Sequence, residues 1–159
     1  MERMTHIQYF TNLLPSIAKR STCLRRNVGA IIVKDKSIIS TGYNGSPAGC
    51  KHCNEIGCIR QKLGSPSGTD VELCRGAHAE MNAICQAARF GICLDKSIIY
   101  SSTYPCVWCM KMIINSGIRK VYYIEDYPDT LSKQLANEAG IECIPVKMLL
   151  LAANEKKLE

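Results

Sequence analysis

The residues of this sequence that could do chemistry form two short groups, His-Ala-Glu at residues 78–80 and Pro-Cys-Val-Trp-Cys at residues 105–109. Imidazole nitrogen and thiolate sulfur are preferred ligands of zinc. Three such ligands leave the fourth tetrahedral position open to water, as in catalytic zinc sites. Glu80 follows the histidine by two positions, so its carboxylate could act on that water without being a ligand. A carboxylate placed in this way can take a proton from the water and pass it to a substrate.

Both groups are expected at the start of a helix, which would bring them together. The pattern predicts one helix over His78–Phe90 and another that opens after Pro105, a residue favoured in the first helical turn. Cysteines three residues apart in one turn present both thiolates to the same point, and the positive helix ends favour thiolate over thiol. Taken alone, the Cys-x2-Cys pair could also be a redox pair or a chance spacing.

The other elements predict one α/β domain around these two helices. An amphipathic helix is expected from Thr5 to about Arg20, in which Pro15 predicts a kink or a restart. Two strands joined by a turn at residues 34–36 follow, and strands then alternate with helices. This order favours a three-layer α/β/α domain with a five-stranded mixed sheet whose later strands are parallel. Strands are expected at 28–33, 37–41, 97–101, 120–124 and 142–146. Helices are expected at 130–139 and at about 148–157, and the second of these would pack on a partner subunit.

Composition excludes several classes of protein. The chain has 159 residues, 47% of them hydrophobic and 21% charged, which suits one packed domain rather than a disordered chain. No apolar run reaches the ~18 residues of a membrane helix and the first residues lack a signal-peptide pattern, so a soluble, cytoplasmic protein is expected. A net charge of +6 and a pI near 8.8 suit an anionic ligand but fall short of a dedicated nucleic-acid-binding domain.

The chain contains 10 cysteines, and in a reducing compartment clustered cysteines bind metal or catalyse more often than they form disulfides. Cys50, Cys53, Cys58 and Cys74 lie in the long stretch from Gly42 to Gly76, which is rich in Gly, Ser and Pro. A loop of that length needs either a function or a cross-link that orders it, and the spacing of the cysteines suits metal ligands. The alternative is a set of surplus reduced thiols. Cys85, Cys93 and Cys143 are expected to be small buried hydrophobic residues.

The two chemical groups together match the His-x-Glu and Pro-Cys-x-x-Cys signature of zinc nucleobase deaminases. The chain resembles the cytidine deaminase-like superfamily and, within it, the deoxycytidylate (dCMP) deaminases of bacteria and bacteriophages. The resemblance covers nearly the whole chain, including Val-Gly-Ala at 28–30, Gly-Tyr-Asn-Gly at 42–45 and His-Ala-Glu-Met-Asn-Ala-Ile at 78–84. It implies a single cytidine deaminase-like domain over residues 1–159, with a Cys-rich insertion at about 46–76.

The resemblance also implies roles for individual residues. The catalytic zinc would be held by His78, Cys106 and Cys109, and Glu80 would be the proton shuttle. Asn44 would hydrogen-bond the sugar hydroxyl, and the backbone N–H of Ala79 would meet the pyrimidine carbonyl. The implied reaction is hydrolytic deamination of dCMP to dUMP and ammonia, which supplies dUMP for dTMP synthesis.

A second zinc and a regulatory site are implied in the same way. The structural zinc of similar deaminases would here be bound by Cys23, Cys53, Cys58 and Cys74. Cys50 stands where relatives usually have Gly, so Cys50 and His52 are reserve ligands. The stretch Gly42, Tyr43, Asn44 and Gly45 is associated in the family with a nucleotide site between subunits of a hexamer. The resemblance suggests dCTP and dTTP as effectors, although relatives differ in this regulation.

Substrate recognition stays open between alternatives. Arg26 and Asn27 are candidates for phosphate contact, but basic residues at this point would also complement a helix C-terminus. Tyr104 could pack on the base or in the core. Nucleoside deaminases and tRNA adenosine deaminases share the zinc chemistry, although the moderate pI and the lack of a long basic tail argue against a nucleic-acid partner. A zinc-stabilised regulatory module without turnover is the remaining alternative, and the presence of Glu80 argues against it.

Overall fold

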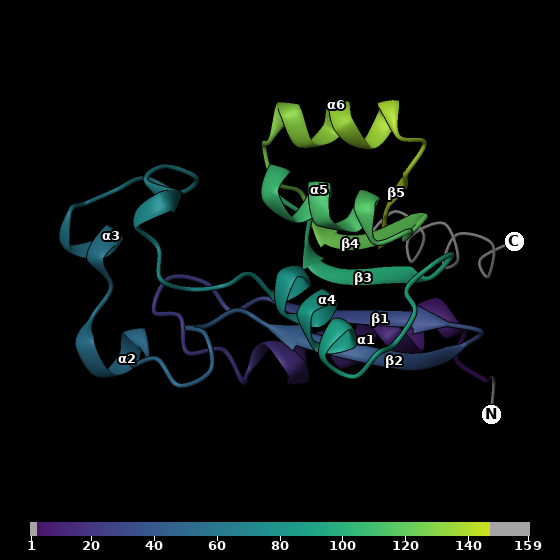
Figure 1. The fold of residues 1–159 in the computed structure, drawn as a ribbon, viewed down its shortest axis with the longest axis horizontal. Coiled ribbons are helices and arrows are strands. Elements are labelled where there is room, and N and C mark those ends of the chain that lie inside the picture. The colour runs from purple at the N-terminus through teal and green to yellow at the C-terminus, as the bar shows by residue number, and fades with distance from the viewer. Residues whose placement is uncertain (1–2, 147–159) are drawn as a thin grey trace, which may run out of the picture.

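The computed structural model describes residues 3–146, which form a mixed sheet covered by helices on both faces (Figure 1). The strands are β1 (Gly29–Lys34), β2 (Ser37–Tyr43), β3 (Ile98–Thr103), β4 (Lys120–Glu125) and β5 (Glu142–Pro145). The helices are α1 (His6–Ala18), α2 (Cys53–Ile56), α3 (Ile59–Lys62), the 3₁₀ turn η1 (Val71–Leu73), α4 (Ala79–Arg89), α5 (Val107–Asn115) and α6 (Thr130–Glu138). No helix among the described residues is long and apolar enough to cross a membrane.

The sheet has five strands in the order β2-β1-β3-β4-β5. β1 pairs antiparallel with β2 and β3, whereas β3, β4 and β5 are parallel to one another. The hairpin between β1 and β2 turns through Asp35 and Lys36, whose φ angles of 49° and 62° are those of a tight two-residue turn. The predicted α/β fold, with a five-stranded mixed sheet and parallel later strands, is therefore confirmed.

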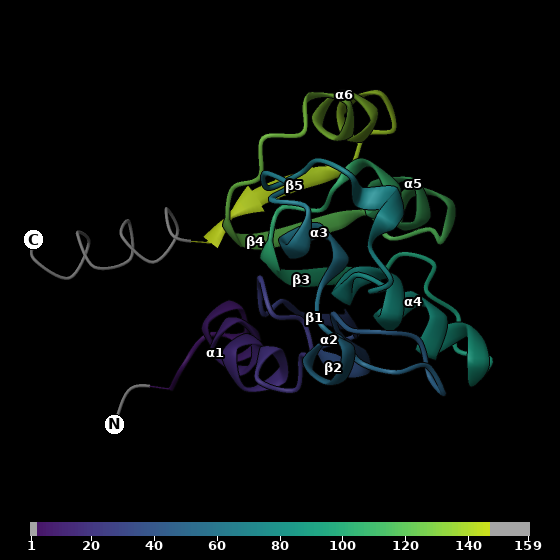
Figure 2. The same cartoon turned by 90° about the vertical axis from the view of Figure 1, so that its left-hand side faces the viewer.

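Two apolar cores hold the layers together, one on each face of the sheet. Figure 2 shows α1 on one face and α4 and α5 on the other. On one face Phe10 and Leu14 of α1 pack on the β1 residue Ile31 and on two stacked tyrosines, Tyr100 and Tyr122. The opposite core contains the sheet residues Ala30, Ile32, Ile99 and Val121 together with apolar residues of α4, α5 and α6. The face covered by α4 and α5 is the one that carries the two chemical groups.

The element boundaries agree closely with those expected, with two qualifications. α1 begins after Thr5, whose side chain accepts a hydrogen bond from the backbone N–H of Gln8, and it continues through Pro15 as one helix without a restart. The expected tail helix at about 148–157 lies outside the described residues. Between Gly45 and Ala77 the chain leaves the sheet and contains only α2, α3 and η1. Gly45 and Ala77 exchange two backbone hydrogen bonds of 3.1 and 2.8 Å, which close the base of this segment.

α4 lies close against β2 because residue 42 has no side chain. A Cβ at Gly42 would overlap the backbone of Ala79 and Ala83 on α4. The Ser40 hydroxyl, one pleat earlier on β2, donates a 2.6 Å hydrogen bond to the carbonyl of Ala83. These contacts fix the distance between α4 and the sheet, and therefore the position of the residues at the start of α4.

Candidate active site

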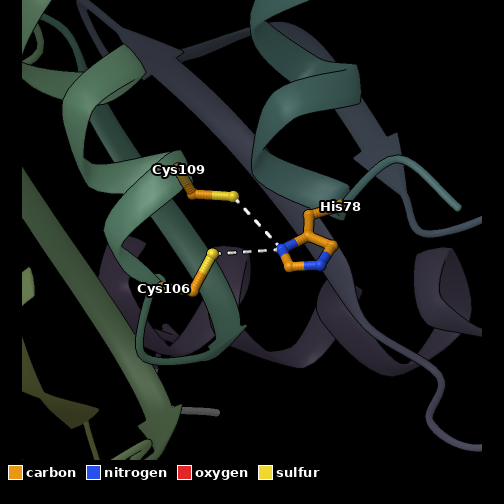
Figure 3. Close-up of side chains that lie close together, drawn as sticks. All are labelled: His78, Cys106 and Cys109. Carbon is orange, nitrogen blue, oxygen red and sulfur yellow. Dashed lines mark hydrogen bonds between the residues drawn. The ribbon is translucent and has the colours of Figure 1, made fainter. Parts of the chain in front are cut away.

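The first turns of α4 and α5 bring the predicted ligands together (Figure 3). His78 is the N-cap residue of α4, Cys106 is the N-cap residue of α5, and Cys109 lies in the first turn of α5. Nδ1 of His78 is 3.2 Å from Sγ of Cys106 and 3.5 Å from Sγ of Cys109. The three ligand atoms all lie within 4.8 Å of one another. The helix starts expected from the sequence are thus what places these side chains.

Of the two thiols, Cys106 is poised to lose its proton and Cys109 to keep it. The pKa of Cys106 is lowered to about 4 because the Cys109 thiol, and less strongly the His78 ring, hydrogen-bonds to its sulfur, while burial opposes the shift. The same bond to Cys106 holds the pKa of the Cys109 thiol well above its usual value, and burial acts in the same direction. The two sulfurs therefore share one proton, and a cation that binds both must displace it.

Two sulfurs and one imidazole nitrogen form a donor set that fits zinc. Among residues 3–146 no fourth His, Cys, Asp or Glu joins the converging group, so a tetrahedral ion there would keep one position for water. The donor set is consistent with a catalytic rather than a structural zinc. His78, Cys106 and Cys109 are the residues that would hold it.

Glu80 lies beside this group, one residue into α4, and is only 3% exposed. The Ser101 hydroxyl on β3 donates a 2.7 Å hydrogen bond to Oε1 of Glu80. Burial raises the pKa of the Glu80 carboxyl, which the bond from Ser101 opposes. A raised pKa makes the carboxylate a stronger base, which favours the acceptance and return of a proton that proton transfer in catalysis requires.

A cavity of about 290 Å³ opens onto these residues, near the lower end of the volumes typical of small-molecule sites. Of the residues singled out in the sequence, it is lined by Arg26, Asn44, Ala79 and Tyr104 together with His78, Glu80 and Cys106. Asn27 is not among the lining residues. Tyr104 is only 4% exposed and packs edge-on against Tyr123, so it is both a core residue and part of the wall.

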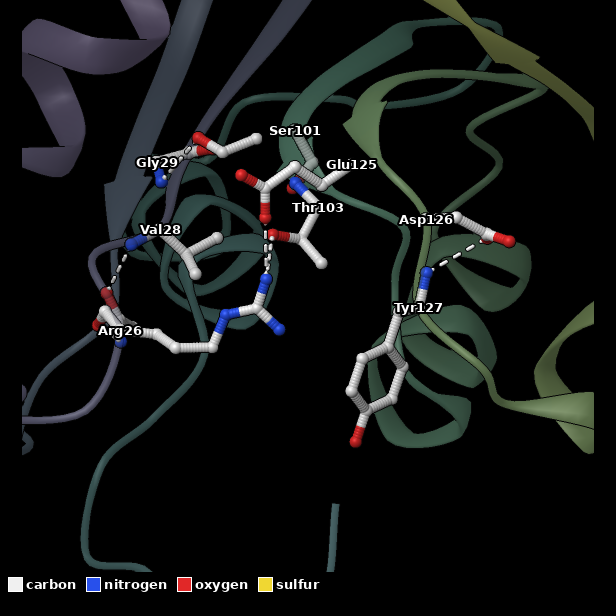
Figure 4. Close-up of polar contacts among 10 residues, drawn as sticks. Arg26, Val28, Gly29, Ser101, Thr103, Glu125, Asp126 and Tyr127 are labelled. Atoms are coloured by element: carbon white, nitrogen blue, oxygen red, sulfur yellow. Dashed lines mark hydrogen bonds and ion pairs between the residues drawn. The ribbon is translucent and has the colours of Figure 1, made fainter. Parts of the chain in front are cut away.

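The side chain of Asn44 is held at both ends by the segment before β1. Its Oδ1 accepts a hydrogen bond from the backbone N–H of Val28, and its Nδ2 donates to the carbonyl of Arg26, both at 2.8 Å. The Arg26 guanidinium forms an ion pair of 2.7 Å with Glu125 and lies 3.4 Å from the Thr103 hydroxyl (Figure 4). Asn44 therefore shapes the wall of the cavity, and Arg26 enters it with its charge already balanced.

The four residues expected to bind a structural zinc are found at the same cavity. Cys23, Cys53, Cys58 and Cys74 all line it, and burial together with the neighbouring Cys58, Cys23 and Cys74 raises the pKa of Cys53. Within residues 3–146, however, their sulfurs do not converge as the catalytic ligands do. Cys50 is exposed, and the His52 ring lies 3.1 Å from the Thr22 hydroxyl.

Two expectations about the remaining cysteines are wrong. Cys85 and Cys93 are exposed rather than buried. Cys85 lies on α4, whose buried face is formed by Ala79, Ala83 and Ala87, and position 85 does not share that face. Cys143 is half-buried and packs against the core beneath α5 and α6, so that expectation is met in part.

Two functional neighbours were missed in the sequence, Ser101 and Asp129. Ser101 hydrogen-bonds to Glu80 and orients it, although 21 positions of the sequence separate the two residues. No local pattern signals such a contact. Asp129 accepts a 2.8 Å hydrogen bond from the backbone N–H of Val107, directly after the ligand Cys106. The start of α6 at Thr130 could be recognised from the sequence, but the hydrogen bond between the residue before it, Asp129, and the start of α5 could not.

Comparisons with known proteins agree with this geometry. Residues 4–125 match the family model of the cytidine and deoxycytidylate deaminase zinc-binding region. ComE operon protein 2 of Bacillus subtilis is 43% identical over 99% of this chain and 82% of its own length. Deoxycytidylate deaminase of Schizosaccharomyces pombe is 38% identical over 84% of this chain but only 42% of its own length, so this chain spans less than half of that relative.

A solved structure is similar throughout the described fold. The crystal structure of dCMP deaminase from the cyanophage S-TIM5 in complex with dCMP and dUMP is 29% identical, with a TM-score of 0.74. The match covers 91% of this chain and 99% of that chain. The fold thus has a counterpart among solved structures.

Proposed function

Because the chain belongs to the cytidine and deoxycytidylate deaminase family, we propose that it hydrolyses the 4-amino group of dCMP and releases dUMP and ammonia. The observation that carries this proposal is the convergence of His78, Cys106 and Cys109 beside the buried carboxyl of Glu80. The nucleotide is supported by relatives named deoxycytidylate deaminase and by a similar structure that holds dCMP and dUMP.

Each residue contributes a separate step to the reaction. Zinc, when bound, supplies an acidified water at neutral pH. Glu80 accepts a proton from the attacking water and delivers it to N3 of cytosine, while Ser101 keeps the carboxyl in place. Glu80 then takes the remaining proton from the hydroxyl now on C4 and passes it to the amino group, which leaves as ammonia while C4 becomes a carbonyl. The backbone N–H of Ala79 at the start of α4 holds the pyrimidine carbonyl, and Asn44 holds the sugar hydroxyl.

The test follows the ultraviolet absorbance of the cytosine band with zinc-loaded full-length protein. dCMP, deoxycytidine and dCTP are supplied separately. Loss of the band with dCMP and a much slower loss with deoxycytidine would support the proposal. Equal rates with both would make the protein a nucleoside deaminase. If none of the three compounds reacted, the proposal would fail, and the remaining interpretations would be an RNA substrate or a regulatory module without turnover.

We propose a second, structural zinc at Cys23, Cys53, Cys58 and Cys74. All four residues line the same cavity, and Cys53 and Cys58 are buried, which supports this second site. Such an ion would tie the insertion to the segment after α1 and add to folding free energy. Metal analysis should give two zinc ions per chain, and one in Cys53→Ser. A single zinc in the unmodified protein would contradict the second site.

We also propose that the Gly42–Gly45 stretch belongs to an effector site for dCTP or dTTP in a homo-oligomer, with a hexamer expected. A second cavity of about 450 Å³, lined by Gly42, Tyr43, Gly45, Asn82 and Arg89, supports this. Rates with dCMP should depend on added dCTP and dTTP, and light scattering should give the mass of the oligomer. Rates independent of both nucleotides would contradict effector binding.

A further inference from the structure

Three arginines line the substrate cavity, and they differ in whether their charge is already balanced. Arg26 is paired with Glu125 at 2.7 Å. Arg25 and Arg60 occur in none of the ion pairs formed among residues 3–146. Nη1 of Arg25 and Nε of Arg60 are buried, and neither has a hydrogen-bond partner in that part of the chain. Two buried donors on two cations in one cavity call for an anionic acceptor.

Successive carbonyl groups of one loop hold both side chains. Nη2 of Arg25 donates to the carbonyl of Ser65 at 2.7 Å, and Nη2 of Arg60 donates to the carbonyl of Pro66 at 3.4 Å. Both guanidinium groups are therefore anchored on the same loop, although like charges that share a site repel. An anion bound between them would remove the repulsion and satisfy the unpaired N–H groups.

The two arginines come from different segments of the chain. Arg25 precedes β1, whereas Arg60 lies on α3 within the Cys-rich insertion, as do Ser65 and Pro66. The same cavity contains His78 and Glu80. A ligand in this cavity can thus contact both the residues at the start of α4 and the arginines.

We propose that Arg25 and Arg60 form a phosphate-binding site in the active-site cavity, and that the insertion thereby selects a nucleoside monophosphate over a nucleoside. A guanidinium fork matches two phosphate oxygens, and two forks can hold a dianion. Arg26, with its charge balanced by Glu125, then helps to shape the site rather than bind the phosphate. The choice of a cytosine nucleotide rests on the proposed function, whereas the anion site itself does not.

The test compares Arg60→Gln with Lys62→Gln, a control that removes a cation from the same short helix. For Arg60→Gln we expect kcat/KM for dCMP to fall on the order of 10- to 100-fold, as for the loss of a hydrogen bond to a charged group. The rate with deoxycytidine should not change, and Lys62→Gln should alter neither. Arg25→Gln removes the other cation from outside the insertion and should show the same selective loss. An equal loss with both substrates, or no loss, would overturn the proposal.

Binding of inorganic phosphate separates this proposal from the proposed function. Calorimetry on the zinc-loaded protein should detect phosphate binding that is weakened in Arg60→Gln and Arg25→Gln and kept in Lys62→Gln. That result would support the anion site even if no cytosine compound were deaminated. Phosphate binding that is unchanged in both arginine variants would show that the anion lies elsewhere.

Discussion

The carboxylate of Asp129 accepts a hydrogen bond of 2.8 Å from the backbone N–H of Val107, the first residue of α5. Its other oxygen accepts a 2.9 Å bond from the backbone N–H of Ser132, in the first turn of α6. The Ser132 hydroxyl in turn donates a 2.7 Å bond to the carbonyl of Pro105. The start of α6 therefore holds the turn that carries Cys106 and Cys109.

Asp129→Ala should weaken both the fold and the zinc site. Loss of a helix cap lowers the free energy of unfolding by about 1–2 kcal/mol. Loss of a group that orients a metal-binding turn weakens metal binding by about 10- to 100-fold. Urea unfolding and chelator competition measure the two effects. Thr5→Ala removes the cap of α1, far from the metal ligands, and should lower stability without changing zinc affinity. An equal effect of both variants on zinc would contradict the link between Asp129 and the site.

Glu80→Gln should separate zinc binding from turnover. The amide cannot accept and return the proton, so kcat should fall by about 10²- to 10⁴-fold, the usual contribution of a general acid–base group. Zinc content should stay the same because Glu80 is not in the converging ligand set. Glu142→Gln, which removes an exposed carboxylate paired with Lys120, is the control for loss of charge. Substantial turnover in Glu80→Gln would exclude the proton-shuttle role.

Ser101→Ala tests whether Glu80 must be held in place. The variant removes the buried 2.7 Å hydrogen bond to Glu80. We expect kcat to fall by about tenfold, which corresponds to an activation free energy higher by roughly 1.4 kcal/mol. Ser102 is the matched control, because its side chain points to the opposite face of β3 and bonds to the backbone of Gly29. Steady-state kinetics with dCMP distinguishes the two. An equal loss of kcat in Ser102→Ala would mean that β3 itself was disturbed.

Local patterns were sufficient to predict the elements and the zinc ligands. Pro105 marks a helix start by its fixed φ angle, and a short continuous run of apolar residues marks β1, so these boundaries depend on a few neighbouring residues. The pairing of His78 with Cys106 followed because both are at helix starts on the same face of the sheet. Such features depend on the backbone, which the sequence specifies over short distances.

Contacts between distant segments could not be predicted from these patterns. Arg60 joins the cavity only because the insertion folds back over the segment that precedes β1, and nothing in residues 46–76 signals that direction. The exposure of Cys85 was misjudged because cysteine is buried on average, but average burial does not define a helix face. The alanines at 79, 83 and 87, four positions apart, define that face and leave Cys85 outside it.

Gly42→Ala should destabilise the protein whether or not nucleotides are present. The added Cβ would overlap the backbone of Ala79 and Ala83, so α4 must move, and overpacking of this kind costs about 1–3 kcal/mol. Gly76→Ala is the control, because its Cβ would meet the Cys74 sulfur at an ordinary 3.6 Å. Urea unfolding measures both variants. Normal stability in Gly42→Ala would mean that this glycine is needed for ligand binding rather than for packing.

Thiol modification should proceed in two stages that depend on zinc. Cys50, Cys85 and Cys93 are exposed and should react first with an aromatic disulfide reagent, without loss of deaminase activity. Cys109 is buried and, with Cys106, should react only after a chelator removes the zinc, and activity should disappear in that second stage. In the double variant Cys85→Ser with Cys93→Ser, fewer thiols should react in the first stage, and full activity should remain. Its free energy of unfolding should lie within about 0.5 kcal/mol of that of the unmodified protein, as for other surface changes. Loss of activity during the first stage would show that an exposed cysteine serves the site.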